Sequence, residues 1–203
     1  MEQQPQEPQE GGLQRDRPHQ ETDRAPDAPR IYVASLADYN AGLLHGTWVD
    51  AAQSSEDLYG AVEQMLRASP TAGAEEFAIF DYEGFGPFRL HEYESLDNVA
   101  KVAKGIAEYG AAFAHFVHLT EGSDLDPLTA FEDAYLGHWE SVEAYAEQLL
   151  DDYGYEDRIG RSWPEPIQPY VRVDIETIAR DLELSGDITT SEGDGGVYVF
   201  QNW

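Results

Sequence analysis

The chain of 203 residues contains 40 Asp and Glu against 12 Lys and Arg, a formal net charge of −28 at pH 7, with 41% hydrophobic residues. It has no Cys, which excludes disulfides, thiol chemistry and Cys-based zinc sites. The sequence shows neither an apolar run of membrane-spanning length nor the apolar core of a signal peptide, so the expected location is the cytoplasm.

Residues 1–30 are rich in Gln, Pro, Glu and Asp and hold seven acids and four Arg. With so little to bury, they are expected to form a disordered leader that folding does not need. The rest of the chain then carries 33 acids and 8 bases, a net charge of −25. Repulsion of this size destabilises a fold, which indicates either a function for the charge or a generally acidic proteome.

Residues 31–92 are expected to form a small α+β domain. Apolar and β-branched runs predict strands at 31–36, 45–49 and 76–81. A turn is expected over 38–42 and a Gly-containing loop over 82–88. Ser54 or Ser55 precedes two acidic residues, a pattern typical of a helix start.

Residues 93–129 are expected to be mainly helical. One helix begins after Ser95 and ends at Gly110, and a second covers 111–118. A short helix is predicted to open at Pro127, because Pro is favoured at the first helical position. Periodicity leaves open whether 134–138 continues this helix or forms a strand.

Residues 130–203 are expected to form a second α+β domain. Ser141 is predicted to cap a helix with a buried apolar stripe, formed by Val142, Tyr145, Ala146, Leu149 and Leu150. A Pro-rich bridge at 163–169 leads to a helix that Asp174 caps. The segments 187–190 and 197–200 flank a Gly-rich turn and predict a hairpin.

An acidic stretch covers residues 105–157, which contain thirteen acids and no Lys or Arg. Aromatic and aliphatic residues are interspersed throughout, so the stretch is expected to fold. Within it Glu143, Glu147 and Asp151 recur every four residues, which places a charge about every 6 Å along one helix face. Like charges at this spacing destabilise a helix, so we interpret the row as functional.

Recognised catalytic patterns are absent from the sequence. His115 and His118 are three residues apart, but a zinc site needs two further ligands and no H-E-x-x-H pairing exists. There is no G-x-S-x-G elbow, P-loop or calcium loop. We therefore predict no catalytic site, metal or cofactor. The larger aromatic residues are interpreted as core residues rather than interface anchors; they are Trp48, Tyr135, Trp139 and Trp163.

A series of collinear segments carries a family resemblance. They are IYVASLADYNAG (31–42), HGTWVD (45–50), FDYEGF (80–85), YESL (93–96), YGAAF (109–113), YLGHWESVEAYAE (135–147), ARDL (179–182) and GGVYVF (195–200). On these segments the chain resembles the ArdA family of antirestriction proteins. The leader falls outside the resemblance.

The resemblance implies a non-enzymatic inhibitor of type I restriction–modification enzymes, carried by mobile elements. Family members are elongated dimers with three small domains per chain that mimic bent B-DNA, so the domains here are expected at 31–92, 93–129 and 130–203. The implied partner is the methyltransferase core, with no direct binding of nucleic acid and no membrane. As homodimer interface we predict the terminal hairpin, taking 197–200 as an unpaired edge strand.

The charge supports such mimicry independently. The roughly 50 net charges of a dimer equal those of about 25 base pairs, because B-DNA carries one charge per about 1.7 Å. Contacts to phosphates position a protein on DNA without reading the base sequence. A mimic of the phosphates therefore does not have to imitate any particular base sequence. We assign the phosphate-mimicking role to seven acids, namely Glu132, Asp133, Glu140, Glu143, Glu147, Asp151 and Asp152.

Two other functions are compatible with the composition. An acidic adaptor that binds another basic DNA-binding protein shares the charge signature, and competition with DNA for a restriction–modification methyltransferase would separate it from a DNA mimic. A metal-dependent hydrolase could use the carboxylates, and an activity lost on chelation would support that function.

Overall fold

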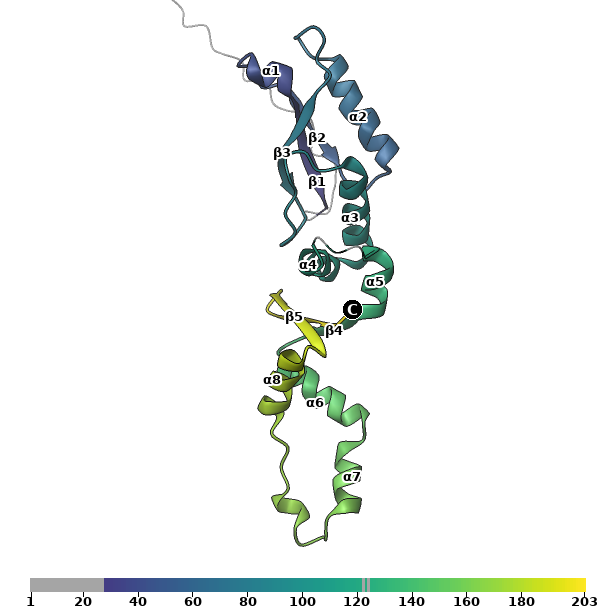
Figure 1. The fold of residues 1–203 in the computed structure, drawn as a ribbon, viewed down its shortest axis with the longest axis vertical. Coiled ribbons are helices and arrows are strands. Elements are labelled where there is room, and N and C mark those ends of the chain that lie inside the picture. The colour runs from purple at the N-terminus through teal and green to yellow at the C-terminus, as the bar shows by residue number, and fades with distance from the viewer. Residues whose placement is uncertain (1–27, 122, 124) are drawn as a thin grey trace, which may run out of the picture.

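The structure, a computed structural model, describes residues 28–121, 123 and 125–203. The elements form one elongated column, with the first sheet at one end and the helix of residues 155–162 at the other, and the last two strands return to its middle (Figure 1). Helices and antiparallel sheets are mixed, which confirms the α+β class. Most of the predicted leader lies outside the described residues, but Arg30, which we placed in it, opens the first strand.

The N-terminal sheet has the order β2-β1-β3 and is antiparallel throughout. Its strands are β1 (Arg30–Ser35), β2 (Gly46–Asp50) and β3 (Phe77–Glu83), close to the predicted segments. Helix α2 (Ser55–Arg67) begins as predicted, because the Ser54 side chain accepts a hydrogen bond from the backbone N–H of Asp57. Its buried residues Leu58, Val62 and Met65 join the core.

The turn predicted over 38–42 is correct only for Ala41 and Gly42, because a short helix, α1 (Leu36–Asn40), occupies the residues before them. The Ser35 hydroxyl caps α1 by accepting from the backbone N–H of Asp38, 3.3 Å away. Only then does the chain turn, at Gly42, whose φ of 78° favours glycine. The helix is stable at this length because the Asp38 side chain is fully buried and hydrogen bonded.

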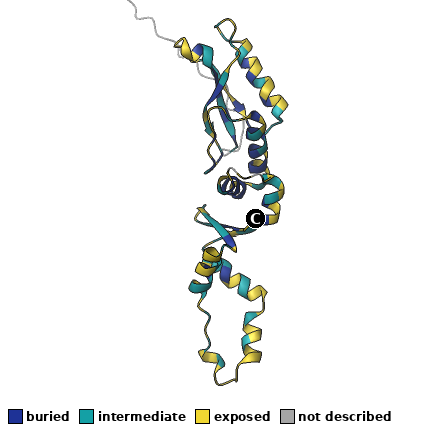
Figure 2. Cartoon of the chain, in the orientation of Figure 1, coloured by how far each residue is buried: buried dark blue, intermediate teal, exposed yellow. Residues whose placement is uncertain are grey.

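Three helices form the middle of the column: α3 (Leu96–Tyr109), α4 (Ala111–Leu119) and α5 (Pro127–Ala134). Their predicted starts are confirmed. Buried apolar residues form one cluster that runs from Ile31 in the first sheet through these helices to Phe200 (Figure 2). The N-terminal sheet and the middle helices therefore share a core, and the division at 92 and 129 stays a prediction.

The C-terminal sheet has the order β4-β6-β5, built from β4 (Tyr135–Trp139), β5 (Ile188–Gly193) and β6 (Gly196–Gln201). The segment left open between helix and strand is thus a strand, and the hairpin of β5 and β6 is confirmed. The edge-strand prediction for 197–200 is wrong. These residues lie in the central strand and pair with β4 on one side and β5 on the other.

Between β4 and β5 the chain makes an excursion through α6 (Val142–Asp152), α7 (Tyr155–Ser162), the 3₁₀ helix η1 (Gln168–Tyr170) and α8 (Ile175–Ser185). Helix α7 was not predicted. The buried stripe predicted for α6 is wrong apart from Ala146, and Ala146 and Ala179 are the buried residues in this described segment. Helices α6 and α8 pack against one another without a third layer to cover them (Figure 1).

Candidate functional site

All seven carboxylates predicted to mimic phosphates are exposed in the structure. Two lie on α5, one lies between β4 and α6, and four lie on α6; in chain order they are Glu132, Asp133, Glu140, Glu143, Glu147, Asp151 and Asp152. Their exposure lets carboxylate oxygens accept hydrogen bonds from Lys or Arg of another protein. Glu132 and Asp152 already accept one hydrogen bond each, from Tyr109 and Gln148.

An open groove of about 650 Å³ lies between the start of α6 and the β5–β6 turn. Three carboxylates line it, those of Glu140, Glu143 and Glu192. The Ser141 hydroxyl, which caps α6, holds the pKa of the Glu143 carboxyl below its usual value by hydrogen bonding. Glu143 is therefore ionised at neutral pH, and the groove is acidic on both walls.

A second groove of about 500 Å³ lies nearer the end of the column. Glu147, Asp151 and Glu156 line it together with Arg172 and several apolar residues. The carboxylate row predicted on α6 is thus divided, because Glu143 faces the first groove and the next two acids face the second. The three acids lie on one face of α6, but they line two different grooves.

The two acids on α5 differ in how free they are. The Glu132 carboxylate accepts a hydrogen bond of 2.6 Å from the Tyr109 hydroxyl, which raises the pKa of Tyr109 to about 12. Asp133 instead lines an open cavity of about 460 Å³. Asp126 in the same cavity lies 3.2 Å from Lys101, and this contact lowers the pKa of its carboxyl. Of the two acids on α5, Asp133 is therefore more available than Glu132 to another protein.

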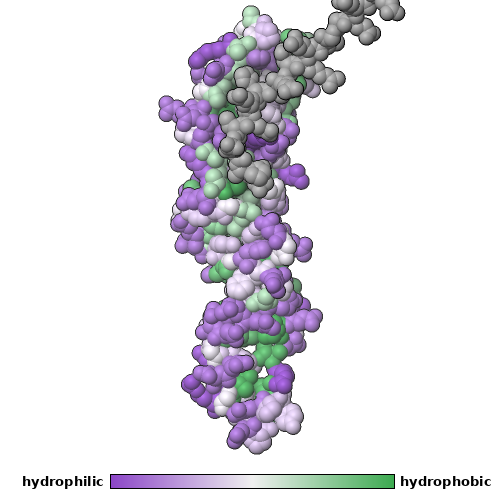
Figure 3. All heavy atoms as spheres, turned by 180° about the vertical axis from the view of Figure 1, so that it is seen from behind, coloured by the Kyte–Doolittle hydropathy of each residue, from purple (hydrophilic) through white to green (hydrophobic). Residues whose placement is uncertain are grey.

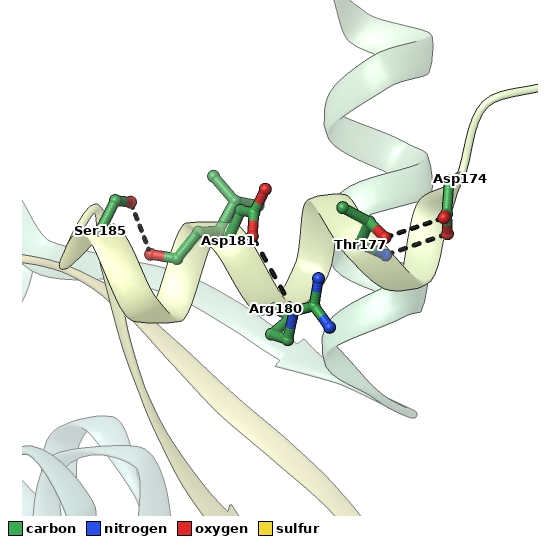
Figure 4. A network of polar contacts seen from close by, with 6 residues as sticks. Asp174, Thr177, Arg180, Asp181 and Ser185 are labelled. Carbon is green, nitrogen blue, oxygen red and sulfur yellow. Dashed lines mark hydrogen bonds and ion pairs between the residues drawn. The ribbon is translucent and has the colours of Figure 1, made fainter.

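Of the acids outside residues 105–157, Asp174 was predicted as a helix cap and is confirmed, whereas the place of Glu192 was not predicted. On α8, Asp174 caps the helix by accepting from both the backbone N–H and the hydroxyl of Thr177, at 3.1 Å and 2.8 Å (Figure 4). Glu192 lines the first groove, although it lies outside the stretch from which the phosphate-mimicking acids were assigned. Glu192 reaches this groove because the hairpin of β5 and β6 lies beside the start of α6. No local sequence pattern indicates that the hairpin and α6 are neighbours.

The two histidines three residues apart on α4 have different surroundings, because His118 is exposed. His115 is buried, and its Nδ1 lies 2.7 Å from the Ser191 hydroxyl. Over residues 28–121, 123 and 125–203 there is no group of three or more His, Asp or Glu that could hold a metal. In the same residues no helix is long and apolar enough to cross a membrane.

Comparison with known families identifies the chain. The family described as antirestriction protein (ArdA) matches residues 31–196. This match covers the N-terminal sheet, the middle helices and most of the C-terminal part, including both acidic grooves. No curated protein matches the chain in sequence. Because the family match spans most of the 203 residues, the chain belongs to the ArdA family of antirestriction proteins.

Proposed function

We propose that the protein inhibits type I restriction–modification enzymes by occupying their DNA-binding groove as a mimic of B-DNA. The observation that carries the proposal is the charge of −25 outside the leader, displayed on a narrow, elongated column (Figure 1). Membership of an antirestriction family supports the same function.

Fixed helices give these carboxylates the spacing that mimicry needs. Acids four residues apart on α6 are separated by about 6 Å along the helix axis, which places several charges of one sign in a regular row. Lys and Arg groups that bind phosphate oxygens accept carboxylate oxygens in the same geometry. Since such contacts position DNA without reading its sequence, one inhibitor can act on enzymes with different recognition sites.

Competition with DNA tests the proposal directly. A purified type I methyltransferase bound to a fluorescent DNA duplex should release that duplex when the protein is added at stoichiometric amounts. Release should weaken as salt rises, because charge drives the association. A complex that forms while the duplex stays bound would contradict mimicry and favour the acidic adaptor.

We also propose that the chain forms a homodimer through the distal end of the column, residues 153–173, which we call the tip. The tip contains three acids and three Arg, so it is neutral within a strongly acidic chain. Trp163, Ile167 and Tyr170 are 48%, 45% and 83% exposed there. Seen from behind, hydrophobic surface also gathers toward this end (Figure 3).

Electrostatics favours the tip as the place where two copies meet. Elsewhere two chains present acids to one another and repel, whereas the tip adds no net charge. The second groove opens beside it and is lined by apolar residues that include Leu150, Ile159 and Val173. This surface replaces the terminal hairpin as the proposed interface, because β6 is already paired on both sides.

Adding charge to the tip should dissociate the dimer. With Ile167→Asp and Tyr170→Asp together, sedimentation velocity at micromolar protein and ordinary salt is expected to show monomers where the parent sediments as a dimer. Tyr93→Asp is the matched control, since Tyr93 is 71% exposed and lies between β3 and α3, away from the tip. A parent protein that is monomeric under these conditions would refute the homodimer. A double variant that remains dimeric would show that the interface is not the tip.

A further inference from the structure

The two halves of the column meet at a joint where α4 and α5 pack against the C-terminal sheet (Figure 1). One side of this joint is apolar and aromatic. Phe116 on α4 lies 5.5 Å from Phe200 and 5.3 Å from Trp203, measured between ring centroids. Phe131 on α5 stacks at 5.0 Å on Tyr135, the first residue of β4. These contacts contain no group that titrates near neutral pH.

The other side of the joint is built from imidazoles. His115 on α4 contacts the Ser191 hydroxyl on β5, and its ring lies 4.6 Å from the ring of Tyr198 on β6. On β4 the ring of His138 lies 4.5 Å from the same tyrosine, and its Nε2 is 3.0 Å from the carbonyl oxygen of Gly193. Tyr198 is thus held between two histidines from different elements.

The fit around His115 is close. A Cβ built at Gly193 would lie 2.6 Å from its Nε2, so the β5–β6 hairpin approaches the imidazole as closely as a glycine allows. The Tyr198 hydroxyl donates a hydrogen bond to the Asp194 carboxylate in the hairpin turn. A change of charge on His115 therefore acts on the hairpin directly.

We propose that this joint is a proton-operated hinge, in which protonation of His115 releases the turn end of the β5–β6 hairpin, residues 191–198, from α4 while Phe200 and the rest of the aromatic side keep the halves in contact. The column then bends about the aromatic side. The relative orientation of the N-terminal and C-terminal acids changes without unfolding either half.

The charges that face His115 set the direction of the response. Burial opposes its cationic form, and His118 on the same helix and His138 on β4 oppose it further when they are charged. Asp194 in the hairpin turn favours the cation, but its carboxylate is engaged by the Tyr198 hydroxyl. The balance lowers the pKa of His115 below its ordinary value of 6.5.

The sign of the pH effect follows from this lowered pKa. Once released, His115 regains an ordinary pKa and binds a proton more readily than the docked residue. Packing of the hairpin against α4 is therefore fully favoured above about pH 6.5. It weakens as the pH falls from there toward the lowered pKa of the packed His115. Most carboxylates remain ionised down to about pH 5.5, so the effect can be separated from their titration.

A fluorescence experiment tests the hinge without reference to any partner. Because the chain has no Cys, Gln64→Cys on α2 and Leu184→Cys on α8 can be labelled with a donor and an acceptor on either side of the joint. Single-molecule energy transfer is expected to show one population at pH 7.5. At pH 5.5 a second population should appear, with a midpoint below pH 6.5.

Two variants identify the responsible group. His115→Asn stays uncharged and keeps an atom near the position of Nδ1, so its energy transfer should not change between pH 7.5 and 5.5. His118→Gln, at an exposed position on the same helix, should respond like the parent. His115→Phe, which keeps a ring against Tyr198, replaces the asparagine variant if that protein does not fold.

Two results would overturn the proposal. One is an unchanged distance distribution in the parent protein at pH 5.5, and the other is a response that persists in the folded His115 variant. A proton NMR titration gives an independent readout, since the His115 ring should titrate below 6.5 in the parent. Because neither measurement involves a restriction enzyme, failure of the hinge leaves the proposed inhibition untouched, and the reverse also holds.

Discussion

Neutralising four carboxylates at the start and along the face of α6 should weaken binding to a type I methyltransferase by about 10- to 100-fold, since several exposed charge contacts of modest strength are lost together. The changes are Glu140→Gln, Glu143→Gln, Glu147→Gln and Asp151→Asn. Single changes should each cause a smaller, graded loss. Binding of the quadruple variant should also depend less on salt than that of the parent, because fewer charges take part.

A charge-conserving variant is the matched control for this loss. Glu140→Asp, Glu143→Asp, Glu147→Asp and Asp151→Glu keep all four charges while altering side-chain length, so most of the affinity should remain. Melting temperatures should show that the neutral variant is at least as stable as the parent, because repulsion along the helix is relieved. If the parent and the neutral variant bind the methyltransferase with equal affinity, α6 is not part of the surface that mimics DNA.

The largest effect on folding is expected from Asp38, the one acid in the described residues that is fully buried. Its carboxylate accepts hydrogen bonds from Ser69 at 2.6 Å and Thr71 at 2.5 Å, which joins α1 to the loop after α2. Asp38→Asn presents an amide donor to these hydroxyl groups, so the melting temperature should fall by about 5–10 °C. Thermal unfolding followed by circular dichroism measures the change.

A nearby exposed acid provides the comparison. Glu75→Gln removes one charge in the same unit and should leave the melting temperature within about 2 °C of the parent. Burial opposes ionisation of Asp38, but hydrogen bonds from Ser69, Thr71 and Ser35 hold the pKa of its carboxyl below the ordinary value. Its contribution is therefore present above about pH 3.9 and is lost as the pH falls through the lowered pKa. Equal stability of Asp38→Asn and Glu75→Gln would contradict this role.

Helix starts were the most predictable part of the fold, because their signal is local. Ser54, Ser95, Ser141 and Asp174 each accept from a backbone N–H two or three residues further on. Such a cap needs no tertiary partner, so residue type and spacing are sufficient to find it. The strands of the first sheet were equally visible, because they follow apolar, β-branched runs.

Features that depend on distant residues were not predictable. Helix α1 resembled a turn because Asp, Asn and Gly lie close together, and what stabilises it is the contact of Asp38 with residues 31 and 33 positions away. The central place of β6 arises from pairing with β4, which lies some sixty residues earlier. Helix α7 has no buried residue, and its apolar face consists of Tyr155 and Ile159 alone, too short a pattern to predict a helix.

The exposed acids of the site were predictable and their surroundings were not. Because residues 105–157 contain acids but no Lys or Arg, a negatively charged surface could be expected from the sequence. Division of the α6 row between two grooves depends on where the hairpin turn and the tip fold back against the helix. The bond from Tyr109 to Glu132 joins residues 23 apart, and no local pattern marks it.

The excursion between β4 and β5 is anchored at both ends by one sheet, since β6 pairs with the strands that precede and follow it. Within these described residues only Ala146 and Ala179 are buried, so melting of α6, α7 and α8 exposes little apolar area. Local unfolding of such a segment requires far less free energy than global unfolding. Amide protons there should exchange early while the sheet stays protected, and a backbone break within the tip would leave the two fragments held together by strand pairing.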